Sequence, residues 1–90
     1  MNRITFSAAG WEEYLEWQLR DKRTLAKINA LLKDIGHNGP LAGTGKPEAL
    51  TGNLSGRFSR RINEADRLVY EIDGDGSVVV LQCNGHYGDR

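Results

Sequence analysis

The segment Arg67–Cys83, RLVYEIDGDGSVVVLQC, decides the fold because it contains two strands and the turn between them. Apolar residues occupy every second position from Leu68 to Ile72, which is typical of a strand with one buried face. Asp73–Gly76 carries two Asp-Gly pairs, which favour a tight hairpin turn. Ser77–Cys83 is a β-branched apolar run suited to a central strand. The segment therefore predicts an antiparallel hairpin in the middle of a sheet.

A further strand is predicted immediately upstream of this hairpin. Residues 57–62 alternate in polarity, and one side of the strand carries Phe58, Arg60 and Ile62. A turn at Asn63–Asp66 then leads into the hairpin. The three strands form a meander, in which each strand pairs with the next.

The segment Gly39–Gly56 precedes the meander and is expected to be a long loop. It is rich in Gly, Pro, Thr, Asn and Ser and shows no sustained period. Long ordered loops in compact domains commonly carry function. This loop contains Lys46 and Glu48, which makes both residues candidates for a site.

The N-terminal part predicts a strand and two helices. Arg3–Ser7 alternates in polarity, and Ser7 and Asp21 are suited to cap the helices that follow them. The second helix is expected to end between Gly36 and Pro40. One face of the first helix carries Trp11, Tyr14, Leu15 and Gln18, with Glu12, Glu13 and Glu16 turned outward; the buried face of the second carries Leu25, Ile28, Leu32 and Ile35. The fold class is α+β, a single domain over residues 1–90, with helices on one face of a mostly antiparallel sheet.

Composition restricts the class of protein. Apolar residues make up 39% of the chain and charged residues 27%, which is globular rather than disordered. No window approaches the ~20 apolar residues of a membrane span, and no secretory signal is present, so a cytosolic protein is expected. The single cysteine, Cys83, excludes an internal disulfide, and with two histidines it gives no zinc ligand set, so no metal or cofactor is predicted. A core of this size makes a homodimer plausible through the aromatic residues of the first helix.

Charge is unevenly distributed although the net charge is zero. Residues 42–70 contain five basic and three acidic side chains, whereas residues 71–90 contain four acidic side chains and one basic one. The middle of the chain therefore carries a mild basic patch that is suited to phosphate contacts. This balance is too weak to predict tight non-specific binding of nucleic acid.

Side chains from separate strands are expected to converge on one face, because alternate residues share a side. Arg57, Arg61 and Arg67 would lie beside the Lys46–Glu48 loop, with His86 and Tyr87 emerging nearby. A carboxylate base, an arginine and an imidazole acid are the groups that cleave an RNA backbone without metal. Each residue alone has a simpler interpretation, as a solvated charge or a packing residue, and adjacent Arg60 and Arg61 should be split between the two faces.

Four segments resemble a known family: GTGKPEAL (43–50), NLSGRFSRRI (53–62), EADRLVYEI (64–72) and CNGHY (83–87). Together with the helical segments WEEYLEW and DKRTLAKINALLKDI, they are similar to the YoeB (Txe/YoeB) family of bacterial toxins. The likeness covers nearly the whole chain in the same order. It implies the RelE-like, microbial-ribonuclease-type fold and a toxin of a type II toxin–antitoxin pair.

The resemblance also implies an activity and partners. Family members cleave mRNA in the A site of the 70S ribosome and are held inactive by a YefM-like antitoxin. The catalytic positions of the family correspond to Glu48, Arg67, His86 and Tyr87. The contacts to RNA or phosphate correspond to Lys46, Arg60 and Arg61, with Arg57 added from the strand pattern.

Three positions depart from the family pattern. Thr44 stands where a second lysine is frequent, Asp66 where a histidine is frequent, and Phe58 where a tryptophan is common. Residues Gly88–Arg90 also extend past Tyr87. Two other functions stay open at this point: a non-catalytic module that binds an antitoxin or, like the ParE toxins, a protein target, and a ribonuclease that needs no ribosome.

Overall fold

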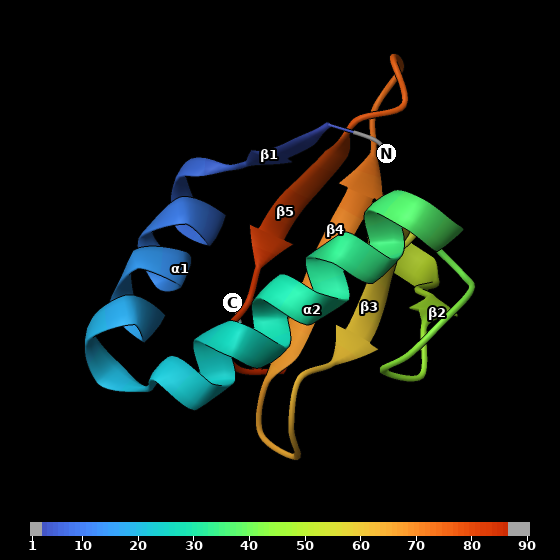
Figure 1. The fold of residues 1–90 in the computed structure, drawn as a ribbon. Coiled ribbons are helices and arrows are strands. Elements are labelled where there is room, and N and C mark those ends of the chain that lie inside the picture. The colour runs from blue at the N-terminus through green and yellow to red at the C-terminus, as the bar shows by residue number, and fades with distance from the viewer. Residues whose placement is uncertain (1–2, 87–90) are drawn as a thin grey trace.

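The fold is an α+β arrangement of one five-stranded sheet and two helices, described here for residues 3–86 of a computed structural model (Figure 1). The order across the sheet is β1-β5-β4-β3-β2. Neighbouring strands are antiparallel from β5 to β2, which confirms the predicted meander, whereas β1 runs parallel to β5. The strands are β1 (Ile4–Phe6), β2 (Glu48–Ala49), β3 (Arg57–Arg61), β4 (Arg67–Ile72) and β5 (Val78–Gln82).

The two helices follow each other as the predicted hairpin, α1 (Ala8–Arg20) and α2 (Lys22–Asn38). Both predicted caps are confirmed. The Ser7 hydroxyl accepts the backbone N–H of Gly10 at 3.1 Å, and the Asp21 carboxylate accepts the N–H of Arg23 at 3.0 Å. These bonds satisfy backbone donors that have no partner inside the helix. Neither helix is long and apolar enough to cross a membrane within the described part of the chain.

The core lies between α2 and one face of the sheet. Figure 1 shows α2 crossing the strands and α1 lying along the β1–β5 side. Alternate residues of β4 and β5 point toward α2, as the period of two requires. The fully buried residues of this layer are Ile28, Leu31, Ile35, Leu68, Tyr70, Val78 and Val80.

Helix α1 is rotated relative to the predicted packing: Gly10, Glu13 and Trp17 are buried, and Tyr14 of the predicted face packs against the core. At Gly10 the helix approaches β5 so closely that an added Cβ would lie 2.4 Å from the carbonyl oxygen of Val80. This contact turns Glu13 inward, where its carboxylate accepts the N–H of Cys83 at 2.7 Å. The prediction that Glu13 faces outward was therefore wrong, and Trp11 is 46% exposed instead.

The segment between α2 and β3 contains more structure than the predicted loop. Glu48–Ala49 forms the short edge strand β2, and Gly52–Leu54 forms one 3₁₀ turn. Two residues are too few to produce a periodic signal, which is why the sequence did not reveal β2. Because β2 pairs with β3, it places Glu48 directly opposite Ser59.

Candidate active site

A pocket of about 120 Å³ lies on the face of the sheet opposite α2. In β3, Arg60 points toward α2, so the next residue, Arg61, points to the opposite face of the sheet. The loop and strands β2, β3 and β4 thus bring together four of the eight predicted site residues, and the alternation of polarity had indicated this for the strand positions. The pocket is lined by Lys46, Glu48, Ser59, Arg61 and Arg67.

The carboxylate of Glu48 is held by a residue that the sequence analysis missed. The Ser59 hydroxyl lies 3.4 Å from Glu48 Oε1 and donates to it across the β2–β3 pair. Ser59 is 2% exposed, whereas Glu48 is exposed. The alternation in β3 does put Ser59 on the same face as Arg61. The sequence pattern therefore placed Ser59 in the pocket, but a serine in a strand does not by itself indicate a functional residue. The pair leaves a carboxylate that is accessible from solvent and fixed on one side.

Two arginines lie directly opposite each other in the pocket. Arg61 pairs with Arg67 across β3 and β4. Like charges at such positions destabilise a sheet, and a bound anion between them removes the repulsion. Nη1 of Arg67 also donates to the carbonyl oxygens of Asn63 at 2.7 Å and Asp66 at 3.1 Å, which fixes this guanidinium at the end of the strand.

The loop reaches the pocket through an unusual backbone conformation. Lys46 has φ = 51°, in the left-handed region that non-glycine residues rarely adopt, and it precedes Pro47, which restricts it further. Gly45 before it accepts the N–H of Arg61 at 2.7 Å through its carbonyl oxygen. Such strain persists only where the surroundings hold it, and it is concentrated at functional sites.

The chain after β5 is held beside the start of β4. The Arg67 N–H donates to the carbonyl oxygen of Gly85 at 2.8 Å, and the Gly85 N–H donates to the carboxylate of Asp66 at 2.8 Å. Gln82 is 7% exposed, and its Nε2 donates to the carbonyl oxygens of Asn84, Gly85 and His86 at 2.9, 3.2 and 2.9 Å. The exposed His86 therefore follows a segment fixed against Arg67, and neither Gln82 nor Asp66 was predicted to hold it. Tyr87 and Gly88–Arg90 lie outside the described residues.

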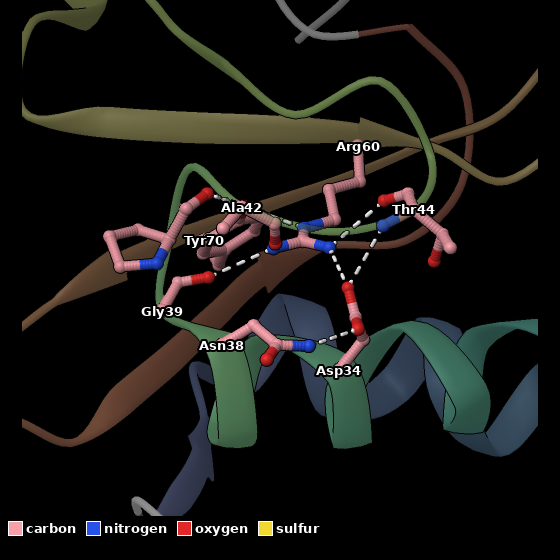
Figure 2. Close-up of polar contacts among 8 residues, drawn as sticks. Asp34, Asn38, Gly39, Ala42, Thr44, Arg60 and Tyr70 are labelled. Atoms are coloured by element: carbon pink, nitrogen blue, oxygen red, sulfur yellow. Dashed lines mark hydrogen bonds and ion pairs between the residues drawn. The ribbon is translucent and has the colours of Figure 1, made fainter.

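Two of the predicted phosphate contacts lie elsewhere. Arg57 is at the other end of β3 and forms a half-exposed ion pair with Glu71 at 3.9 Å. Arg60 has no exposed surface, and its guanidinium points toward α2, where it pairs with Asp34 (Figure 2). Figure 2 also shows Thr44 against this guanidinium, which donates to its backbone carbonyl oxygen, a contact that does not depend on the side chain at this position. The prediction that Arg60 contacts RNA is corrected, because no surface of its side chain is available.

A second hollow of about 280 Å³ shares Glu48 with the pocket. Its other walls come from the end of β2 and the 3₁₀ turn. They combine apolar side chains with one hydroxyl, and the residues are Ala49, Leu50, Thr51 and Leu54. Glu48 is thus shared by a hollow lined by three cationic side chains and a second hollow of mixed polar and apolar surface. Among residues 3–86, no three His, Cys, Asp or Glu side chains gather in a way that would hold a metal ion.

Comparison with known proteins identifies the family. The family model of the YoeB-like toxin of bacterial type II toxin-antitoxin system matches residues 6–87. The chain belongs to the YoeB family. Toxin YoeB of Streptomyces coelicolor is 46% identical over 85 residues, which cover 94% of this chain and 99% of the relative. The predicted fold class and family are thereby confirmed.

Solved structures of YoeB proteins agree over the same length. A YoeB dimer from Staphylococcus aureus has a TM-score of 0.87 and 49% sequence identity, covering 96% of this chain and 98% of that one. A YoeB-YefM complex from the same species has a TM-score of 0.88 and 47% identity, covering 97% and 99%. The likeness therefore extends over nearly the full length of both solved chains.

Proposed function

We propose that this YoeB family toxin is an endoribonuclease that cleaves mRNA in the ribosomal A site by acid–base catalysis without a metal. The observation that carries the proposal is the cross-strand pair Arg61 and Arg67 beside Lys46 and the accessible carboxylate of Glu48. Three cations around one carboxylate form a site for a phosphodiester, with a base next to it. A surface that only binds a protein has no need of a carboxylate fixed among three cations.

In the proposed reaction Glu48 removes the proton from the ribose 2′-hydroxyl. The 2′-oxygen attacks phosphorus, the bond from phosphorus to the 5′-oxygen breaks, and His86 gives a proton to that oxygen. The products are a 2′,3′-cyclic phosphate and a free 5′-hydroxyl. An imidazole is suited to the acid role because histidine exchanges protons near neutral pH.

The remaining residues take binding roles in this proposal. Lys46, Arg61 and Arg67 neutralise the charge that builds on the phosphorane oxygens. Ser59 fixes the carboxylate of Glu48 through its hydroxyl. The hollow beyond Glu48 is large enough for a nucleobase or ribose next to the phosphate. Tyr87 stays a predicted substrate contact, and Arg57 stays a predicted contact to RNA outside the pocket.

Replacement of the acid and the base tests the proposal. Glu48→Gln and His86→Gln should each lower cleavage about 10²- to 10⁴-fold on programmed 70S ribosomes, with the thermal unfolding temperature nearly unchanged. Mapping of mRNA 5′ ends measures the cleavage. Glu12→Gln is the matched control, because Glu12 is an exposed carboxylate on α1 away from the pocket. Arg67→Lys keeps the charge and loses the planar fork, so it should lower cleavage as well.

Two outcomes would refute the proposal. If the unmodified protein produces no new mRNA 5′ ends, the chain is a module that only binds its partners. Equal cleavage of free RNA and of ribosome-bound mRNA would show a ribonuclease that does not depend on the ribosome. The experiment therefore includes naked mRNA as a second substrate.

We also propose a YefM-like antitoxin and a second copy of the chain as partners, acting in the cytosol. The cationic pocket suits an acidic segment that folds on binding, and α1 exposes Trp11, Leu15 and Leu19. Size-exclusion chromatography with light scattering should show a dimer that binds the antitoxin and then loses cleavage. A monomer at all concentrations, or cleavage that persists in the complex, would contradict this.

A further inference from the structure

The loop between α2 and β2 is held by hydrogen bonds from the buried guanidinium of Arg60. This group has five N–H donors, and each has an acceptor in the structure. Nε donates to the Tyr70 hydroxyl at 3.0 Å, and Nη1 donates to the Asp34 carboxylate. The other donors contact loop carbonyls: Thr44 at 2.9 Å, Gly39 at 2.9 Å and Ala42 at 2.6 Å (Figure 2).

Two further side chains complete the attachment of the loop. The Asp34 carboxylate accepts the N–H of Thr44 at 3.0 Å, and the Tyr70 hydroxyl donates to the carbonyl oxygen of Pro40 at 2.6 Å. Burial raises the pKa of the Tyr70 phenol, so this group keeps the proton that it donates. Residues 39–44 are therefore fixed at five backbone atoms by one cluster of three side chains, Asp34, Arg60 and Tyr70, the loop anchor.

The anchored segment lies just before Lys46, the first residue along the chain that lines the pocket. Gly45 lies against the anchor, since an added Cβ there would be 2.9 Å from Leu31 and 3.2 Å from the Cβ of Arg60. Lys46 then adopts its left-handed conformation and enters the pocket lining, followed two residues later by Glu48. No flexible spacer separates the anchor from the proposed base.

We propose that Arg60 is a positioning residue for cleavage, which sets the place of Lys46 and Glu48 through the loop without touching the substrate. This inference rests on the proposed function. Arg60 and Arg61 are neighbours in β3, and their side chains point to opposite faces of the sheet. One fixes the incoming loop, and the other lines the pocket that the loop completes.

Stability alone does not account for an arginine at this place. A buried ion pair is weak support for stability, because removing two charges from water offsets much of their attraction. A planar fork that reaches three separate carbonyls does fix where a backbone lies, and lysine cannot reproduce that geometry. Reacting groups that move by about 1 Å lose about 10²-fold in rate, so a small shift of this loop is sufficient to affect cleavage.

The test compares variants of the anchor with a core variant that is destabilised to the same extent. Arg60→Lys and the milder Tyr70→Phe are assayed against Ile28→Ala, a fully buried position of α2 whose apolar side chain makes none of the hydrogen bonds of the loop anchor. Single-turnover cleavage and ribosome affinity are measured separately, well below the unfolding temperatures. Amide hydrogen exchange is followed at Thr44, which donates to Asp34, and at Arg61, which donates to Gly45.

We expect Arg60→Lys to slow the cleavage step about tenfold to hundredfold, with ribosome affinity nearly unchanged and faster exchange at both amides. Tyr70→Phe should show a smaller effect of the same kind, and Ile28→Ala none on the cleavage step. Equal cleavage by the anchor variants and Ile28→Ala at matched unfolding temperature would overturn the inference. If Arg60→Lys does not fold, Tyr70→Phe decides alone. Absence of cleavage by the unmodified protein would refute the proposed function instead, and unchanged amide exchange in the anchor variants would then refute the positioning role.

Discussion

One amide side chain, that of Gln82, donates to three carbonyl oxygens of the segment that carries His86, and its replacement by methionine should loosen this segment. Methionine has a similar length and no N–H donor. Nε2 of Gln82 has two N–H groups for its three carbonyl acceptors, so the substitution removes two hydrogen bonds, one of them shared. At about 0.5 to 1.5 kcal/mol each, the closed form of residues 84–86 loses about 1 to 3 kcal/mol.

This loss corresponds to a population of the open segment that is roughly 5 to 150 times larger. Two backbone N–H groups report the opening directly, because Arg67 donates to Gly85 and Gly85 donates to Asp66. Their amide exchange should accelerate by that factor. Cleavage should fall by less, since its rate follows the closed fraction and not the open one. Global unfolding should shift little, because the segment lies at the end of the sheet.

The matched control is Gln18→Met, the same substitution at an exposed position of α1. The reasoning would be refuted if the amides of Gly85 and Arg67 exchanged at the same rate in Gln82→Met as in Gln18→Met. Equal rates would show that the segment is held by other contacts and that the amide of Gln82 only accompanies them.

Two further predictions concern stability. Gly10→Ala should lower the free energy of unfolding by about 1 to 3 kcal/mol in thermal denaturation, because the new Cβ meets the carbonyl oxygen of Val80; Gly74→Ala, where a Cβ meets nothing within 4 Å, is the control. The Thr44 N–H that bonds to the Asp34 carboxylate lowers the pKa of Asp34 from its ordinary value of 3.8. This group therefore contributes stability above about pH 4 that is lost as the pH falls through its lower folded pKa. Asp34→Asn should flatten this acid-induced fall, and an acid profile equal to that of the unmodified chain would contradict the assignment.

The strand faces followed from the sequence because a period of two depends only on local geometry. The alternation of β3 had already placed Arg60 on the apolar side with Phe58 and Ile62, and Arg61 on the other. What the sequence did not reveal is that acceptors from a distant loop and helix surround Arg60 there. Its burial was hidden because these contacts join residues 16 to 26 positions apart.

The inward turn of Glu13 was hidden for the same kind of reason. Helical periodicity gives the apolar stripe of α1, but the rotation of the helix depends on how closely it approaches β5. That approach is set by Gly10, whose missing side chain produces no hydrophobic signal. The strand β2 is too short to show a periodic pattern in the sequence. The pairing that brings Glu48 opposite Ser59 could therefore not be predicted either.

The buried guanidinium of Arg60 also limits how β3 can align with β4. In a sheet, a slip of one residue moves every side chain to the opposite face. Such a slip would expose Arg60 and turn Ser59 and Arg61 toward α2. When the slip brings Ser59 to the place of Arg60, the acceptors on Thr44, Gly39 and Ala42 lose their donor. The alternative alignment would leave several buried polar groups unpaired at once. The contacts of Arg60 therefore stabilise the native alignment of β3 with β4, which is also the alignment that places Arg61 opposite Arg67 in the pocket.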